Sequence, residues 1–229
     1  MNGGCCLDSL FPLFAPVKMN KAVPALIVVC VLAALCWAFP PFHIRSVKQV
    51  KADLAGATFN PSNFVEKFWI EKLLPSASQA VEAEKVLAAI AANPQKVREQ
   101  FGRTLGISST YCLYLRGNGR VVSVTDDSIG LSLKGEGAAV DISVPLGLVF
   151  GNALRDGTGL INSSTFPNAQ EFNDISAGLN AVVETKVLPE FQKLATVGKR
   201  VQFVGCVEVA DEETDLKPLK LVPVSVKAE

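Results

Sequence analysis

The side chains available for catalysis are few, because the 229-residue chain contains one histidine, His43. Serine and cysteine hydrolases of the triad type need a histidine as general base. His43 directly follows a long apolar segment and lies far from the body of the chain. The same shortage argues against a histidine-bearing metal site. Asp126 and Asp127 are adjacent acids that could bind a cation, but in a Thr-Asp-Asp-Ser loop they are more typical of a solvated turn.

Carboxylate pairs are the remaining acid-base resource of the sequence. A glycosidase-like mechanism uses two acids across a cleft and needs no histidine. The candidates are Asp141, Asp156, Glu171 and Asp174. A carboxylate-dependent hydrolase acting on envelope saccharides is therefore an alternative function, and it requires two of these acids in one pocket with pKa values that differ.

An uncharged apolar segment from Ala22 to Phe42 predicts the compartment. About 20 apolar residues span the hydrocarbon core of a bilayer as a helix, whereas the apolar part of a cleaved signal peptide has about 7 to 15. The segment follows a leader over residues 1–21, in which Met19 is an alternative start. We therefore expect a transmembrane anchor or signal at residues 22–42, with the folded remainder exported to the periplasm or outside the cell.

The processing of this segment is open between two alternatives. Cys36 lies where a lipidated cysteine would, yet Leu35 replaces the small residue that normally precedes such a cysteine. The apolar run also continues past Cys36 to a spanning length, which favours a single-pass anchor over a lipid anchor. Basic residues are nearly balanced on the two sides of the segment, so charge alone does not determine its orientation.

The composition of the chain disfavours nucleic acid as a partner. Its 22 lysine and arginine residues balance 22 aspartate and glutamate residues, and it has only two tyrosines and two tryptophans. A nucleic-acid site needs a basic groove with stacked aromatic side chains. Of the six cysteines, only Cys112 and Cys206 lie in the body. They are either two buried thiols or one bridge formed in an oxidising compartment.

Residues 43–107 are predicted to be a mainly helical segment. Asn60-Pro61 is a helix-start signal, because asparagine caps free N–H groups and proline is tolerated at the first helical position. The first helix runs to about Leu74. Two more helices are expected over about residues 78–92 and 94–101. The first helix has one apolar face, formed by Phe64, Val65, Phe68, Trp69 and Leu73.

Residues 108–229 are predicted to form the β domain, because the apolar period changes to two from Tyr111. Strand-like runs are separated by glycine-containing segments, expected to be a turn or a bulge at residues 117–119 and a turn at residues 135–137. A long helical insertion is expected at 151–198, in which Pro189 breaks or kinks a helix. Its apolar face comprises Ile175, Leu179, Val182 and Val183. The last two strands are expected at 200–210 and 216–226.

This order of elements indicates an α+β fold. Three strands, a helical connection and two strands match a five-stranded oligonucleotide- or oligosaccharide-binding (OB) barrel, whose last strands close the sheet on the first. We expect an antiparallel OB-like barrel with the helical insertion between its third and fourth strands. Such a fold does not by itself determine a function.

Four segments carry a resemblance to a known family. They are FNPSNFVEKFWIEKLLP, GLVFGNALRDGTGL, FPNAQEFNDISAGLN and KPLKLVPVSV, and they resemble an uncharacterised bacterial family of predicted periplasmic lipoproteins, domain of unknown function 2291. The similarity spans roughly residues 48–226. It implies an envelope-attached, extracytoplasmic protein, often encoded beside sugar-type ABC uptake systems. The chemistry of this family is unknown, so the resemblance assigns no catalytic residues. We expect no cofactor.

The resemblance also singles out candidate site residues. They are Trp69, Lys72, Asn152, Arg155, Asp156, Gln170, Glu171, Asp174 and Asn180. One hypothesis is that these planar polar groups and one aromatic platform line a groove for a polar small molecule such as a sugar. The alternative is structural: Arg155 forms a buried bidentate pair with Asp156 or Glu171, the asparagines satisfy loop backbone, and Trp69 is in the core.

We therefore expect a membrane-anchored, non-enzymatic accessory or ligand-binding module linked to a sugar-type ABC uptake system. Its expected partners are the membrane and either transporter components or a small polar solute. A cleft on which Arg155, Gln170 and Glu171 converge would favour ligand binding. An apolar surface patch without such a cleft would favour contact with a partner protein.

Overall fold

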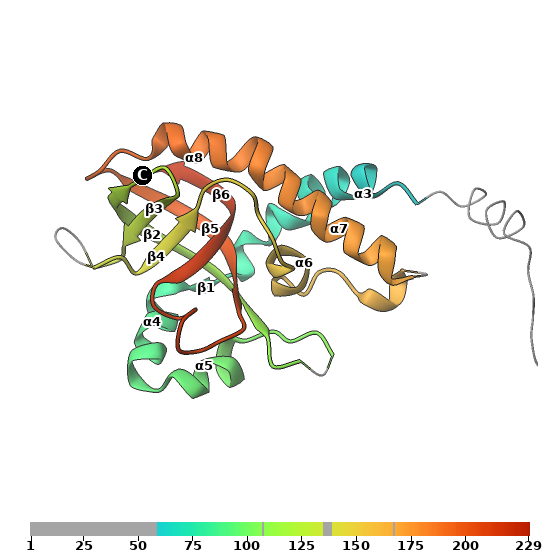
Figure 1. The fold of residues 1–229 in the computed structure, drawn as a ribbon, viewed down its shortest axis with the longest axis horizontal. Coiled ribbons are helices and arrows are strands. Elements are labelled where there is room, and N and C mark those ends of the chain that lie inside the picture. Colours follow the sequence, from blue (N-terminus) through green and yellow to red (C-terminus); the bar gives the residue numbers. More distant parts are fainter. Residues whose placement is uncertain (1–58, 107, 135–138, 167) are drawn as a thin grey trace, which may run out of the picture. The chain divides into compact units, whose positions relative to one another are not determined.

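The computed structural model describes residues 59–229, except residues 107, 135–138 and 167 (Figure 1). The predicted leader and the predicted anchor at residues 22–42 lie outside the described residues. Within the described part of the chain, no helix is long and apolar enough to cross a membrane. The residues from Phe59 to Glu229 form one compact unit.

The body begins with the helix that the Asn60-Pro61 signal predicts. The side chain of Asn60 accepts a hydrogen bond from the backbone N–H of Asn63 at 3.1 Å, which caps the first turn. Helix α3 lies alongside α7 of the later helical connection (Figure 1). The first part of the body comprises α3 (Pro61–Phe68), the π-helical segment η1 (Trp69–Leu73) and the 3₁₀ segment η2 (Pro75–Gln79).

The second predicted helix begins later than the sequence suggests. Residues Val81–Glu82 are extended and form the short strand β1, which pairs in parallel with Leu115 and Arg116. This pairing with a distant strand overrides the local helical tendency at Val81 and Glu82. Helix α4 (Ala83–Ala92) and helix α5 (Pro94–Phe101) then follow as separate helices.

Five strands form a closed barrel with the order β2-β3-β4-β6-β5, and pairing between β2 and β5 closes the ring. The expected all-antiparallel arrangement is wrong at one place, because β4 and β6 are parallel. An odd number of strands in a closed ring cannot alternate in direction throughout, so one neighbouring pair must be parallel. The strands are β2 (Tyr111–Val124), β3 (Ser128–Ser132), β4 (Ile142–Pro145), β5 (Arg200–Val209) and β6 (Leu219–Ala228).

The prediction of a turn or bulge at residues 117–119 is also wrong, because β2 is continuous there. Gly117 and Gly119 pair with Phe203 and Val201 of β5, and β2 then changes partner to β3 near Arg120. A Cβ atom on Gly117 would lie 3.0 Å from Cζ of Phe203. These glycines therefore make room for the core inside a strand, rather than ending it. The other predicted turn, at residues 135–137, lies outside the described residues.

Between β4 and β5 the chain forms a largely helical connection. The helical run from Ala169 continues past Pro189 to Leu194, so proline does not end it. A π-helical segment precedes Pro189 and includes a bond from the N–H of Leu188 to the carbonyl of Val183. The elements are α6 (Ala153–Gly157), η3 (Ser163–Thr165), α7 (Ala169–Val182), η4 (Val183–Val187) and α8 (Leu188–Leu194).

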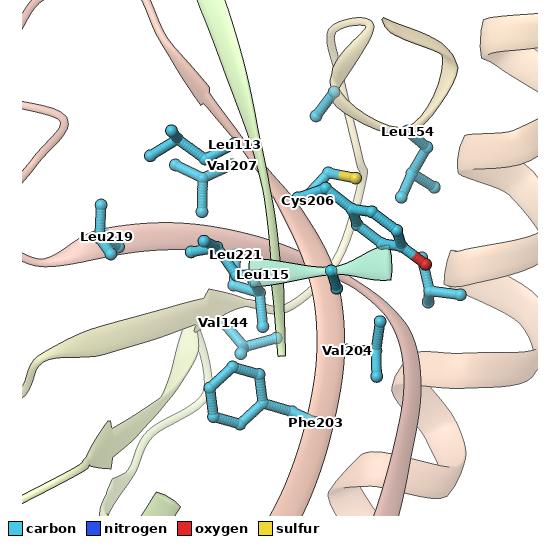
Figure 2. Close-up of a cluster of buried hydrophobic side chains, with 14 of the residues drawn as sticks. Leu113, Leu115, Val144, Leu154, Phe203, Val204, Cys206, Val207, Leu219 and Leu221 are labelled. Carbon is cyan, nitrogen blue, oxygen red and sulfur yellow. The ribbon is translucent and has the colours of Figure 1, made fainter. Parts of the chain in front are cut away.

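The main core fills the barrel and extends under this helical connection. Figure 2 shows side chains from several strands meeting in this cluster, among them Leu115, Phe203 and Leu221. Leu154 of α6 belongs to the same cluster, and α6 contacts β2 and β5. On α7 and η4, Ile175, Leu179 and Val183 are fully buried. The connection is therefore part of the core rather than an appendage to the barrel.

Candidate functional site

Arg155, the most chemically suggestive candidate, is only 5% exposed and has its donors occupied within the protein. Its Nε and Nη2 atoms donate to the two carboxylate oxygens of Asp156 at 2.7 and 3.0 Å. Its Nη1 atom donates to Oδ1 of Asn173 at 3.1 Å. The guanidinium carbon lies 3.8 Å from the ring centroid of Phe172. This geometry is that of a structural link between α6 and α7.

The two candidate asparagines also contact protein groups. Oδ1 of Asn152 accepts a hydrogen bond from the hydroxyl of Ser176 at 2.8 Å. Nδ2 of Asn180 donates to the carbonyl of Gly151 at 3.1 Å. The N–H of Asn152 donates to Glu208 on β5 at 2.8 Å. Together these bonds connect the loop before α6 to α7 and to the barrel.

The candidates at the start of α7 stabilise the first turn of that helix. Asn168 accepts from the N–H of Glu171 at 2.8 Å and donates to its carboxylate at 3.1 Å, which caps the helix reciprocally. Gln170 donates to Oδ1 of Asp174 at 2.7 Å on the exposed surface. Within the described part of the chain, no hydrogen bond or ion pair joins Arg155 to Gln170 or Glu171.

Trp69 and Lys72 have different environments although both lie on η1. Trp69 is 8% exposed and belongs to the core. Lys72 is exposed and lines a cavity of about 510 Å³, here called the α3 cavity. Phe64 and Phe68 of α3 and Phe166 of the helical connection contribute to its apolar wall. Lys72 is therefore the one candidate residue that lines this cavity.

The four acids that could serve a hydrolase all make local structural contacts. Asp141 accepts from the N–H of Leu133 at 2.9 Å. Asp156 pairs with Arg155, Glu171 takes part in the cap of α7, and Asp174 accepts from Gln170. None of the four lines the cavities described here. Among the described residues, no three histidine, cysteine, aspartate or glutamate side chains form a group that could hold a metal ion.

Asp126 and Asp127 lie in the exposed hairpin turn between β2 and β3. The hydroxyl oxygen of Thr125 accepts from the N–H of Ser128 at 3.0 Å across this turn. Leu146 donates its N–H to the backbone carbonyl of Asp127 at 2.8 Å. The two acids therefore occupy a turn, as the solvated-turn interpretation of the sequence predicts.

Cys112 and Cys206 are buried, free thiols on neighbouring strands. Burial raises the pKa of Cys112 to about 12 and raises that of Cys206 well above its usual value. Gly157 of α6 covers both, because a Cβ atom there would lie 3.0 Å from Sγ of Cys206 and 3.2 Å from the Cβ atom of each cysteine. The thiols are therefore protonated at neutral pH and sealed beneath α6, where they are inert as nucleophiles.

The structure also shows an exposed apolar surface that the sequence analysis missed. Leu148 and Phe150, in the loop between β4 and α6, are 72% and 78% exposed. The N–H of Val149 between them donates to Glu184 at 2.7 Å, which fixes the loop to η4. A cavity of about 420 Å³ adjoins both residues. The available signal was the apolar Leu-Val-Phe run that follows Gly147, beyond the end of β4.

The closed barrel with a parallel β4–β6 pair and a helical connection before β5 defines an OB fold. A crystal structure of an OB-fold protein from Thermotoga maritima is similar to this chain, with a TM-score of 0.68 and 23% sequence identity. The match covers 76% of this chain and 100% of the other. It supports the fold, which was expected from the order of the elements.

The family resemblance is confirmed. Residues 26–227 match the family described as predicted periplasmic lipoprotein (DUF2291), and the chain belongs to this family. No match to the chain was found among curated proteins. The family description assigns no activity, so family membership does not identify a reaction or a ligand for this protein.

Proposed function

We propose that this protein is an envelope-attached, extracytoplasmic accessory module of a sugar-type ABC uptake system, and that it acts by contacting a partner protein rather than by catalysis. Its family of predicted periplasmic lipoproteins supports the location. The link to solute uptake rests on the gene neighbourhood that the family resemblance implies. Two features of the described body support this kind of action.

The first feature is the arrangement of the candidate polar residues around Arg155, which form contacts within the protein. The guanidinium donates to Asp156 and Asn173 and covers the ring of Phe172, so it presents no free donor pair to a solute. Gln170 and Glu171 bond to neighbours on their own helix. A sugar could bind to these side chains only if these contacts were first broken.

The second feature, which carries the proposal, is the exposed pair Leu148 and Phe150. Large apolar side chains that are 72% and 78% exposed on one short loop are typical of a protein contact surface. Bonds from Val149 to Glu184 and from Asn152 to Glu208 hold the middle of this segment and the residues that follow it. A partner therefore meets a largely preformed surface, which lowers the entropy lost on binding.

Site-specific photo-cross-linking in the native host tests this function. A benzophenone amino acid placed at position 148 or 150 should cross-link to the permease or the solute-binding protein of the neighbouring uptake system. Position 197 is the matched control, because Val197 is 61% exposed in another loop. Phe150→Glu should also abolish co-purification of that partner, because a charge would be buried in the contact.

Two results would contradict the proposal. One is equal cross-linking of the same partner from position 197. The other is undiminished co-purification of the uptake components with the Leu148→Glu and Phe150→Glu variants, provided that both variants unfold at the wild-type temperature.

A further inference from the structure

The α3 cavity has an apolar wall that is well defined by aromatic contacts. Phe64 and Phe68 are stacked, with ring centroids 5.9 Å apart and an interplanar angle of 8°. Phe166 meets Phe64 edge to face at a centroid distance of 5.6 Å. Leu160 and Ile161 add aliphatic surface to the lining. A volume of about 510 Å³ lies within the usual range of small-molecule sites, and the wall suits the apolar body of a ligand.

The charged groups that line the cavity have an excess of one positive charge. Lys67 and Glu71 form an ion pair at 4.0 Å, and both side chains are more than half exposed, so this pair is weak. Lys72 forms no ion pair with another described residue. Its ammonium group is therefore the available ionic partner for a ligand that enters the cavity.

Other polar groups of the lining are used by the protein itself. Oδ1 of Asn162 accepts from the N–H and the hydroxyl of Ser164 at 3.0 and 2.9 Å. The hydroxyl of Thr165 donates to the carbonyl of Asn162 at 2.7 Å. These bonds leave few polar groups of the lining free for the hydroxyls of a polyhydroxylated ligand, and burying hydroxyls without partners costs free energy.

The aromatic wall packs against a residue that the buried Arg155–Asp156 ion pair holds in place. The ring of Phe166 contacts that of Phe172 at 5.6 Å, and the guanidinium of Arg155 covers Phe172 at 3.8 Å. Arg155 is fixed in turn by both carboxylate oxygens of Asp156. The aromatic wall is therefore supported by a rigid structure, as expected for a largely preformed site.

From these contacts we infer that the α3 cavity binds a small amphiphilic anion, with its apolar body against the phenylalanine wall and its acid group at Lys72. This site is separate from the Leu148 and Phe150 surface. Its existence does not depend on the proposed partner contact. The ligand class is a short-chain or aryl carboxylate, or a chemically equivalent sulfonate.

Binding of octanoate to the body of the protein, residues 59–229, is the test. A body of this extent is suitable because residues 59–229 form one compact unit. Octanoate should bind with one-to-one stoichiometry in calorimetry and displace the fluorescent anion 8-anilinonaphthalene-1-sulfonate. Octylammonium, which has the same chain and the opposite charge, should bind at least about tenfold more weakly, because it loses a charge-assisted contact.

Variants of exposed lysines distinguish binding at a specific site from nonspecific binding. Lys72→Glu should weaken octanoate binding about tenfold or more, and Lys72→Arg should restore it. Lys193→Glu is the matched control, because Lys193 is also exposed but lies on α8. Equal loss with Lys193→Glu, unchanged binding with Lys72→Glu, or competition by glucose or octylammonium as effective as that by octanoate would overturn the inference.

Discussion

At the scale of single residues, Arg155 shows how the surroundings of a side chain decide its role. An arginine in a polar motif is a natural candidate for binding a solute. Here it is buried, hydrogen-bonded through all three guanidinium nitrogens and stacked on Phe172, with Asp156 as its ionic partner. Removing one member of a buried ion pair leaves the other charge without compensation, so the main effect of such a change is on stability.

Arg155→Ala is therefore expected to lower the free energy of unfolding by about 3 kcal/mol, as for other broken buried pairs. Urea denaturation followed by circular dichroism measures this loss. Arg116→Ala is the control, because Arg116 pairs with Glu82 at a site where both side chains are more than 40% exposed. It should cost less than about 1 kcal/mol. An unchanged melting temperature for Arg155→Ala would show that the structural role is wrong.

At the scale of elements, the barrel depends on close approach between β5 and β6. Their register shifts between Val204 and Gly205, which is the mark of a bulge. A Cβ atom on Gly205 would lie 2.5 Å from the carbonyl oxygen of Val222 and 2.9 Å from Cγ of Leu221. The first of these atoms is backbone and cannot rotate away. The two strands therefore need glycine at this position.

Gly205→Ala should reduce the free energy of unfolding by about 1–3 kcal/mol, because the strands must separate to admit the methyl group. Chemical denaturation of the purified protein measures the change. Gly117→Ala is a useful comparison, since its closest neighbour is the edge of the Phe203 side chain at 3.0 Å. That ring can shift, so the cost should be smaller. Equal costs at the two positions would contradict this account of the bulge.

At the scale of the whole molecule, the barrel and its helical connection form one folded body, and family membership associates that body with the cell envelope. Helix α7 packs against α3 and α6, while η4 and α8 contact β6. The connection between β4 and β5 thus unites the N-terminal helices with the barrel.

We expect the full-length protein in the membrane fraction, with its body digested by added protease in spheroplasts and protected in intact cells. A cytosolic protein that stays intact in the same spheroplasts is the control. The mass of the mature N-terminus then distinguishes the uncleaved anchor expected at residues 22–42 from lipidation at Cys36. Recovery of the protein in the cytosol, free of lipid, would contradict the proposed location.

The sequence by itself determined several of the local elements and the family. Asn60-Pro61 predicted the start of α3, and alternation of apolar residues placed the strands β5 and β6 within a few residues. These features depend on neighbours in the chain, so they can be read from spacing. The role of Arg155 depends on contacts with Phe172 and Asn173, which are not its neighbours in the chain. The sequence therefore left two alternative roles open for this residue.

The tertiary structure decided which distant groups meet. It made β2 continuous through Gly117, placed β4 parallel to β6, and brought Lys72 and Phe166 into the lining of one cavity. It also left Leu148 and Phe150 exposed, whereas apolar residues of similar size in the strands are buried. Pairing and burial are settled by contacts between segments far apart in the chain, and the period of a local pattern carries no information about such partners.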